Sequence, residues 1–245
     1  WMAAVFNGGN RFSLPGVAAW AMSIVLWTAA FAPAGWGIGA LWRALRGIQF
    51  RPNSTFWALA AIVLVGATFR LHDLGHVPPE MTSDHVEKLL DAQRVLDGNP
   101  QVFFPNNGGR EPFQMYAMAL FSRLPGLAMD FHTLKLLSAI EGIITLPVLW
   151  WMGRAVIGRD NPRLGNAVGL ALAALVAVSY WHVALSRLGL RIVLTPLVTA
   201  LLIIFLGRAL RHNRRGDFIL AGLVLGFGLY TYQAVRMLPV VVVLG

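Results

Sequence analysis

Long runs of apolar residues, separated by short clusters of arginine, set the pattern of this chain. A helix needs about 20 mainly apolar residues to cross the hydrocarbon of a bilayer. Suitable apolar runs lie at 14–42, 55–70, 133–152, 164–184, 192–207 and 217–233, and a seventh begins near 238. The pattern predicts an all-α fold, a polytopic bundle of membrane helices.

The composition agrees with this class. Of the 245 residues, 57% are hydrophobic and 13% are charged, whereas about 25% of the residues of soluble domains are charged. The net charge of +9 is typical of basic anchoring loops in a membrane protein, so we expect no nucleic-acid partner. The chain contains no cysteine, which excludes disulfide and thiolate chemistry.

The charged residues are divided unevenly along the chain. Residues 71–112 hold Asp73, Glu80, Asp84, Glu87, Asp91, Asp97 and Glu111, most of the 11 carboxylates. Arginines gather in three other loops: Arg43, Arg46 and Arg51; Arg154, Arg159 and Arg163; and Arg208, Arg211, Arg214 and Arg215. Because short basic loops stay in the cytoplasm, we expect the loop 71–112 to be extracytoplasmic. This topology requires the run 113–130 to be an interfacial helix rather than another crossing.

Within the acid-rich loop, Ser83–Gly98 has the pattern of an amphipathic juxtamembrane helix. Ser83 or Asp84 can cap its start, and Gly98 with Pro100 can end it. An apolar stripe of Val86, Leu89, Leu90 and Leu96 lies opposite Asp84, Glu87, Lys88 and Asp91. We expect this helix to rest on the membrane surface with its acids facing an aqueous cleft.

Asp84 lies at the start of that helix, soon after the second apolar run. A carboxylate held at the membrane surface can act as general base on an acceptor hydroxyl. Alternatively, Asp84 is only a helix cap, and the acids that follow it pair with Lys88 and Arg94. Spacing alone leaves both interpretations open.

A second polar cluster spans Pro105–Phe113, where Asn-Gly and Gly-Gly pairs favour a tight turn. This turn carries Arg110 and Glu111. One interpretation makes Glu111 a second acid of an active cleft, with Arg110 among the substrate-binding groups. The other is a surface ion pair, worth under about 1 kcal/mol.

Three more arginines fall on the same side of the predicted topology. Arg187 and Arg191 lie where the fourth and fifth apolar runs meet, and Arg236 follows the sixth. Guanidinium groups match phosphate oxygens, so we expect these three to hold a lipid phosphate, with Tyr232 and Gln233 beside them. Snorkelling of arginines to the interface, with Tyr232 as an aromatic anchor, is the alternative.

Nucleotide-binding and metal-binding motifs are scarce. The chain has neither Gly-x-x-x-x-Gly-Lys nor Gly-x-Gly-x-x-Gly, so we expect no nucleotide site. The histidines are scattered, and only His85, beside Asp84 and Glu80, suggests a metal pocket. We expect no required cofactor, and a divalent metal near Asp84 and His85 stays an alternative.

Taken in order, these motifs resemble the GT-C superfamily of integral-membrane glycosyltransferases, in particular the family 39 group of protein O-mannosyltransferases and bacterial lipid A aminoarabinose transferases. The resemblance rests on Asp84-His85, where members often have Asp-Glu, and on Arg110–Tyr116, Ser186–Arg191 and Tyr232–Pro239. It covers about residues 56 to 245. Residues 1–50 are then an extra N-terminal span with a cytoplasmic basic loop, and 51–245 the N-terminal part of a transmembrane catalytic domain.

The resemblance implies an inverting glycosyltransferase of the plasma (inner) membrane. Its donor would be a polyprenyl-phosphate sugar, and its acceptor a lipid, glycan or protein hydroxyl in an extracytoplasmic cleft, with Asp84 as the base. It also implies a further C-terminal part of the same protein. A transporter or flippase of a lipid-linked anion, which would favour polar or broken helices at mid-membrane, and a non-catalytic scaffold are the other classes.

Overall fold

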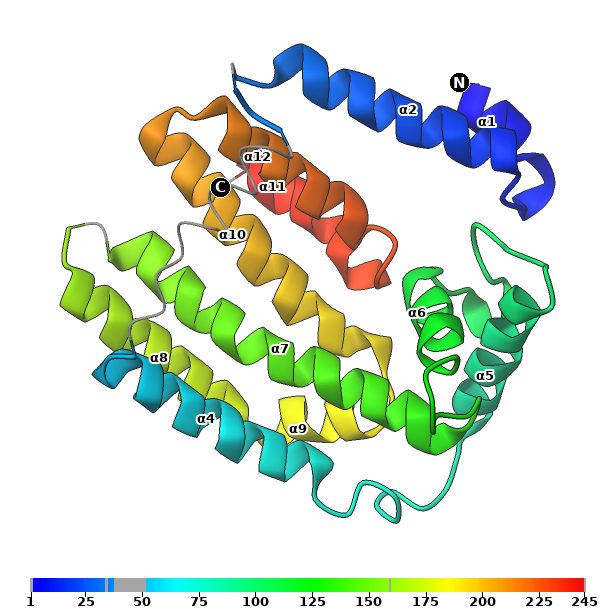
Figure 1. The fold of residues 1–245 in the computed structure, drawn as a ribbon, viewed down its shortest axis with the longest axis horizontal. Helices are drawn as coiled ribbons and strands as arrows, with labels where there is room; N and C mark the ends of the chain where they lie inside the picture. The colour runs from blue at the N-terminus through cyan, green and yellow to red at the C-terminus, as the bar shows by residue number, and fades with distance from the viewer. Residues whose placement is uncertain (1, 34, 38–51, 159, 245) are drawn as a thin grey trace.

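The computed structural model describes residues 2–33, 35–37, 52–158 and 160–244 and forms a bundle of α-helices (Figure 1). No strand occurs in these ranges, where isolated bridges join Arg11 to Gln101 and Phe104 to Arg110. The all-α class predicted from the sequence is therefore confirmed. The arginine cluster at 43–51 and Arg159 lie outside the described residues.

Four segments are long and apolar enough to cross a membrane. They are α2 (Leu14–Phe31), α4 (Ser54–Leu71), α7 (Phe131–Ile157) and Arg191–His212, which combines η3 (Arg191–Val193) with α10 (Leu194–His212). A fifth candidate is the pair α8 (Pro162–Val178) and α9 (Tyr180–Arg187), bent by 56°. The bend lies at Ser179, whose backbone is extended.

Two predicted spans are shorter in the structure. The first run ends at Phe31 rather than near 42, because Ala32 precedes Pro33 and adopts an extended conformation. The sixth run forms α11 (Arg215–Gly228), which has 14 residues and is followed by a turn closed by the Thr231 hydroxyl, which donates to the Gly228 carbonyl at 2.6 Å. The 3-10 helix η4 (Gln233–Met237) and α12 (Leu238–Leu244) follow.

Helix α7 lies at the centre of the bundle, where α4, α8, α9 and α10 pack against it (Figure 1). Small residues let α7 and α8 approach closely, as is common between membrane helices. A Cβ atom added to Gly153 of α7 would lie 2.5 Å from the Gly169 backbone of α8. The central helix is thus held on several sides by other helices.

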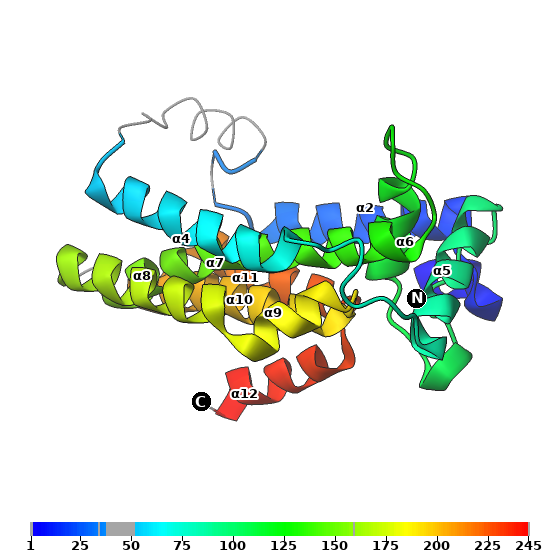
Figure 2. The same ribbon diagram turned by 90° about the horizontal axis from the view of Figure 1, so that it is seen from below.

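The short helices α5 (Ser83–Leu96) and α6 (Phe113–Phe121) gather at one end of the bundle (Figure 2). The chain's start, with α1 (Met2–Phe6) and η1 (Gly8–Asn10), contacts the same region, because the Phe12 amide donates to the Pro100 carbonyl at 3.0 Å. Helix α6 has nine residues and is about 14 Å long. It is too short to cross about 30 Å of hydrocarbon, in agreement with the predicted interfacial helix.

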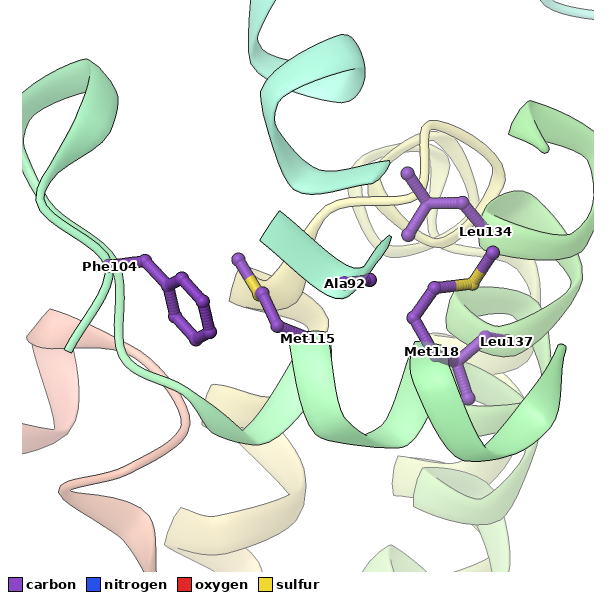
Figure 3. Packing of buried hydrophobic residues seen from close by; sticks show 6 residues of the cluster. All are labelled: Ala92, Phe104, Met115, Met118, Leu134 and Leu137. Carbon is purple, nitrogen blue, oxygen red and sulfur yellow. The ribbon is translucent and has the colours of Figure 1, made fainter. Parts of the chain in front are cut away.

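An apolar cluster packs α5 and α6 against the start of α7 (Figure 3). Its buried members are Ala92, Phe104, Met115, Met118, Leu134 and Leu137. They come from α5, the following loop, α6 and α7, so burial of their side chains joins four segments. This cluster sets the position of the polar residues on α5 and before α6.

The buried face of α5 differs from the sequence prediction. His85, Lys88, Asp91 and Ala92 are buried, whereas Val86 and Leu90 are 41% and 48% exposed. Asp91 was expected to face water, but it is fully buried because a buried arginine pairs with it. Val86 and Leu90 of the apolar stripe therefore face outward from the bundle, whereas Leu89 packs against the apolar cluster.

Candidate active site

Helix α5 begins at Ser83, as predicted, but its cap lies one residue before the earlier of the two predicted caps. The N-cap is Thr82, not Ser83 or Asp84, and its backbone N–H donates to Nδ1 of His85 at 3.0 Å. Asp84 therefore lies in the first turn, where the helix dipole favours a carboxylate. Its side chain is 41% exposed, so a second molecule can reach it.

Two cations hold the Asp84 carboxylate. Nζ of Lys88 lies 2.7 Å from Oδ2, and Nε of Arg110 lies 3.3 Å from Oδ1. Partial burial raises the pKa of Asp84, but Lys88 and Arg110 outweigh that effect, so the pKa lies below its usual value. Asp84 is therefore ionised at neutral pH and ready to accept a proton or a hydrogen bond.

Arg110 connects Asp84 to a buried ion pair. Its Nη1 donates to Oδ2 of Asp91 at 2.7 Å, and neither side chain is exposed. Nη1 of Arg94 lies 2.8 Å from the other Asp91 oxygen. Burial raises the pKa of Asp91, and the two arginines oppose that rise. Removing one partner of such a pair leaves an uncompensated buried charge.

Glu111 joins a second pair of cations. Its Oε2 lies 2.6 Å from Nη1 of Arg191, and its Oε1 lies 2.8 Å from Nη2 of Arg236. The Glu111 side chain is 4% exposed, whereas Arg236 is 56% exposed. The Arg191 guanidinium also lies 5.6 Å from the centre of the Tyr232 ring. One carboxylate thus faces two guanidinium groups, which leaves a positive surplus.

The turn before Arg110 has the predicted geometry. Asn107 in η2 (Asn106–Gly108) has a φ of 50°, and Gly109 has a φ of 92°. The Gly109 carbonyl accepts a hydrogen bond from Nη2 of Arg191 at 3.2 Å. A Cβ atom at Gly109 would overlap the Phe103 ring. Glycine at this position lets the turn approach Phe103 and Arg191.

Arg187 lies apart from the other two arginines that were expected to bind phosphate. Its guanidinium donates to the carbonyls of Phe69, His72 and Val77, at 3.0, 2.8 and 2.9 Å. Arg187 therefore caps the C-terminal end of α4, because the last carbonyls of a helix have no hydrogen-bond donor within the helix. Gln233 is exposed at the start of η4, directly after Tyr232.

His85 points inward rather than toward Asp84. It is 2% exposed, and its ring packs on Phe131 with centroids 4.8 Å apart. Burial is the main cause of its lowered pKa, so the ring is neutral at pH 7. In the part of the chain that the structure describes, no group of three histidine, cysteine or acidic side chains could hold a metal ion.

Sequence reasoning missed several buried polar residues near the site. Lys88 and Asp91 were interpreted as the exposed side of α5. The signal that could have assigned them to the site is their spacing from Asp84, which places all three along one face of a helix. Lys135 and Glu141 of α7 are also buried. Nζ of Lys135 donates to the Pro78 carbonyl at 3.1 Å, and Glu141 accepts from Gln114 at 3.4 Å.

Comparison with protein families shows the class of this protein. The model of the dolichyl-phosphate-mannose-protein mannosyltransferase family matches residues 109–244, more than half of the chain. The chain belongs to this family. The mannosyltransferase family and the apolar helices together identify a membrane glycosyltransferase of the mannosyltransferase type. No curated protein and no solved structure matches the chain.

The match to the mannosyltransferase family begins at Gly109 and so divides the site. It includes Arg110, Glu111, Arg191 and Arg236, whereas α5 and Asp84 precede it. Helix α2 also lies outside the matched range. The ion pairs of Arg110 with Asp84 and Asp91 connect the two parts.

Proposed function

We propose that the chain transfers a sugar from a polyprenyl-phosphate donor to an acceptor hydroxyl of a lipid, glycan or protein, with inversion at the anomeric carbon. The observation that carries the proposal is the placement of Asp84, a partly exposed carboxylate held by Lys88 and Arg110. Arg110 is adjacent in sequence to Glu111, which pairs with Arg191 and Arg236. The residues proposed as base and as phosphate-binding cations thus come from neighbouring ion clusters, which supports this assignment.

In the proposed step, the acceptor hydroxyl gives its proton to Asp84 while its oxygen bonds to the anomeric carbon. The bond between that carbon and the phosphate oxygen breaks, and its electron pair remains on the phosphate. The products are the glycosylated acceptor and polyprenyl phosphate. The lowered pKa of Asp84 keeps its carboxylate in the ionised form that can accept the proton.

Arg191 and Arg236 are proposed to stabilise the charge on the departing phosphate. They share Glu111, so their two positive charges exceed its single negative charge. The exposed Arg236 can turn toward a phosphate at little cost in burial, while Arg191 stays fixed by the Gly109 carbonyl. Guanidinium groups directed at developing phosphate charge lower the barrier to transfer. Tyr232 and Gln233 would line the same site.

The proposed acceptor side is extracytoplasmic, in the plasma (inner) membrane. The loop that carries Asp84 is acid-rich, whereas Arg208, Arg211, Arg214 and Arg215 lie at the other end of α10 and α11. This distribution follows the positive-inside rule. No metal or other cofactor is required in the proposed step.

The test is a transfer assay with the full-length protein in lipid vesicles. Radiolabelled polyprenyl-phosphate mannose is offered with peptide, glycan and lipid acceptors in separate reactions, and mannose linked to a nucleotide serves as the control donor. We expect label on one acceptor class with the lipid-linked donor alone. Transfer from the nucleotide-linked donor contradicts the proposal, and movement of intact donor across the vesicle without transfer identifies a flippase instead.

A further inference from the structure

A large apolar hollow lies between α2 and α11, away from the candidate active site. Figure 1 shows where the two helices run. Its volume is about 1020 Å³, and its wall includes Ile24, Trp27 and Phe31 of α2 and Phe218, Ile219 and Leu223 of α11. Helix α2 is a candidate membrane span. At membrane depth, a hollow lined by such side chains must be filled by hydrocarbon.

A second hollow of about 550 Å³, bordered by arginines, adjoins the first. It is lined by Trp36, Arg208, Asn213, Arg214 and Arg215, among others, and Arg215 borders both hollows. Asp217 also lines it and pairs with Arg208 at 3.3 Å. Among the described residues, Arg214 and Arg215 form no ion pair. This end of the hollow therefore carries unneutralised positive charge.

We propose that this double hollow binds an anionic two-chain phospholipid. The acyl chains would lie between α2 and α11, and the phosphate would meet Arg214 and Arg215. Basic pockets at the ends of membrane helices bind anionic head groups in this way, and Trp36 lies where an interfacial tryptophan commonly does. A zwitterionic lipid would leave the positive charge unbalanced, and a peptide would bring unpaired backbone groups into hydrocarbon.

The proposed lipid is distinct from the sugar donor. Helix α11 begins at Arg215 and ends at Gly228, just before Tyr232 and Arg236. The basic hollow and the candidate active site therefore lie at opposite ends of this helix. The inference does not depend on the proposed function, and it gives α2, which lies outside the family match, a defined role as one wall of a lipid site.

Lipid binding can be measured by native mass spectrometry of the full-length protein after titration with phosphatidylglycerol or phosphatidylcholine. One phosphatidylglycerol should be retained at detergent concentrations that remove phosphatidylcholine. Each arginine near a membrane surface contributes about a fivefold gain in affinity, so the double variant Arg214→Gln and Arg215→Gln should bind about thirtyfold more weakly. Arg163→Gln, an exposed arginine of another basic loop, is the matched control and should bind as the native chain does.

A second pair of variants tests the apolar part. Gly222 lines the hollow, and a Cβ atom there would meet nothing within 4 Å, so Gly222→Leu fills the space without disturbing α11. Gly226 is equally open but does not line the hollow, and Gly226→Leu is the control. We expect Gly222→Leu to lose the bound phosphatidylglycerol and Gly226→Leu to retain it.

Three results would overturn the inference. Equal retention of phosphatidylglycerol and phosphatidylcholine would indicate ordinary lipid around the bundle. Equal binding by Gly222→Leu and Gly226→Leu would place the lipid elsewhere. Displacement of phosphatidylglycerol by polyprenyl phosphate, with the polyprenyl phosphate lost from the same variants, would assign the hollow to the donor lipid.

Discussion

Arg110 and Glu111 are adjacent in the chain, yet their side chains enter two different ion clusters. Arg110 pairs with Asp84 and Asp91 of α5, whereas Glu111 pairs with Arg191 and Arg236. The backbone between them connects the ion cluster of Asp84 and Asp91 to that of Arg191 and Arg236. A change at either residue should therefore affect both halves of the proposed site.

Glu111→Gln should lower stability more than it changes the chemistry of transfer. The amide leaves Arg191 and Arg236 without their counter-charge, and loss of a charged hydrogen bond costs on the order of 2 kcal/mol. A thermal unfolding scan in detergent measures the loss, with Glu80→Gln, an exposed acid of the same loop, as the control. Unchanged unfolding with a hundredfold slower transfer would instead make Glu111 a catalytic acid or base.

Asp84→Asn should reduce transfer by roughly 100-fold or more while the protein stays folded. Asparagine has nearly the same volume, and its one carbonyl oxygen can still accept a hydrogen bond from Lys88 or Arg110, but it cannot take a proton at neutral pH. The initial rate with a polyprenyl-phosphate sugar at saturating donor is the measurement. A native rate in this variant would return Asp84 to a purely structural role in the first turn of α5.

Lys88→Met should move the acid limb of the pH–rate profile to higher pH. Lys88 stabilises the ionised form of Asp84, so its removal raises the pKa of that carboxylate, and protonation then inactivates the base at a less acidic pH. Lys88→Arg keeps the charge and should leave the limb near its native position. An acid limb that does not move in Lys88→Met would mean that Asp84 is not the group that titrates.

Arg236→Gln should change the KM for the donor, whereas Arg187→Gln should change the unfolding temperature. Arg236 is exposed beside Glu111, so its loss should raise the KM for the donor by about 10-fold or more with little change in unfolding temperature. Arg187 donates to carbonyls at the end of α4, so its loss should lower the unfolding temperature and leave KM almost unchanged. Paired unfolding and kinetic measurements separate the two, and the reverse pattern would exchange their roles.

A cysteine in place of Glu80 should react with a membrane-impermeant maleimide in intact cells, because the acid-rich loop is expected outside the cytoplasm. A cysteine in place of Arg163 should react only after permeabilisation. Both positions are exposed, and the chain contains no native cysteine to react. Labelling of the two positions in the opposite order would invert the topology.

The lengths of apolar runs predicted where the long helices lie, but not where each helix ends. Pro33 limits α2, and the turn after Gly228 limits α11, since local backbone chemistry overrides hydrophobicity at these points. The periodicity of α5 was also predictable. The buried face of α5 could not be predicted, because Asp91 is buried by pairing with the fully buried Arg110. Arg110 comes from a distant turn, and no pattern within α5 indicates this partner.

Part of the candidate site could be predicted from the sequence, because the predicted topology places distant segments at the same end of the helix bundle. Glu111, Arg191 and Arg236 were expected on the same side, and their side chains meet. Arg187 was expected with them because it lies four residues before Arg191. However, α9 ends at Arg187, and Gly189, with a φ of 67°, turns the chain, so the two guanidinium groups point to different places.

The sequence separation of the site's ion pairs sets an order of assembly during synthesis. Arg236 follows Glu111 by 125 residues, which a ribosome adding about 5–20 residues per second takes about 6–25 s to make. Arg191 follows Glu111 by 80 residues, so during the whole interval the Glu111 carboxylate lacks at least one of its two counter-charges. The proposed site therefore cannot be complete until the turn after α11 has been synthesised.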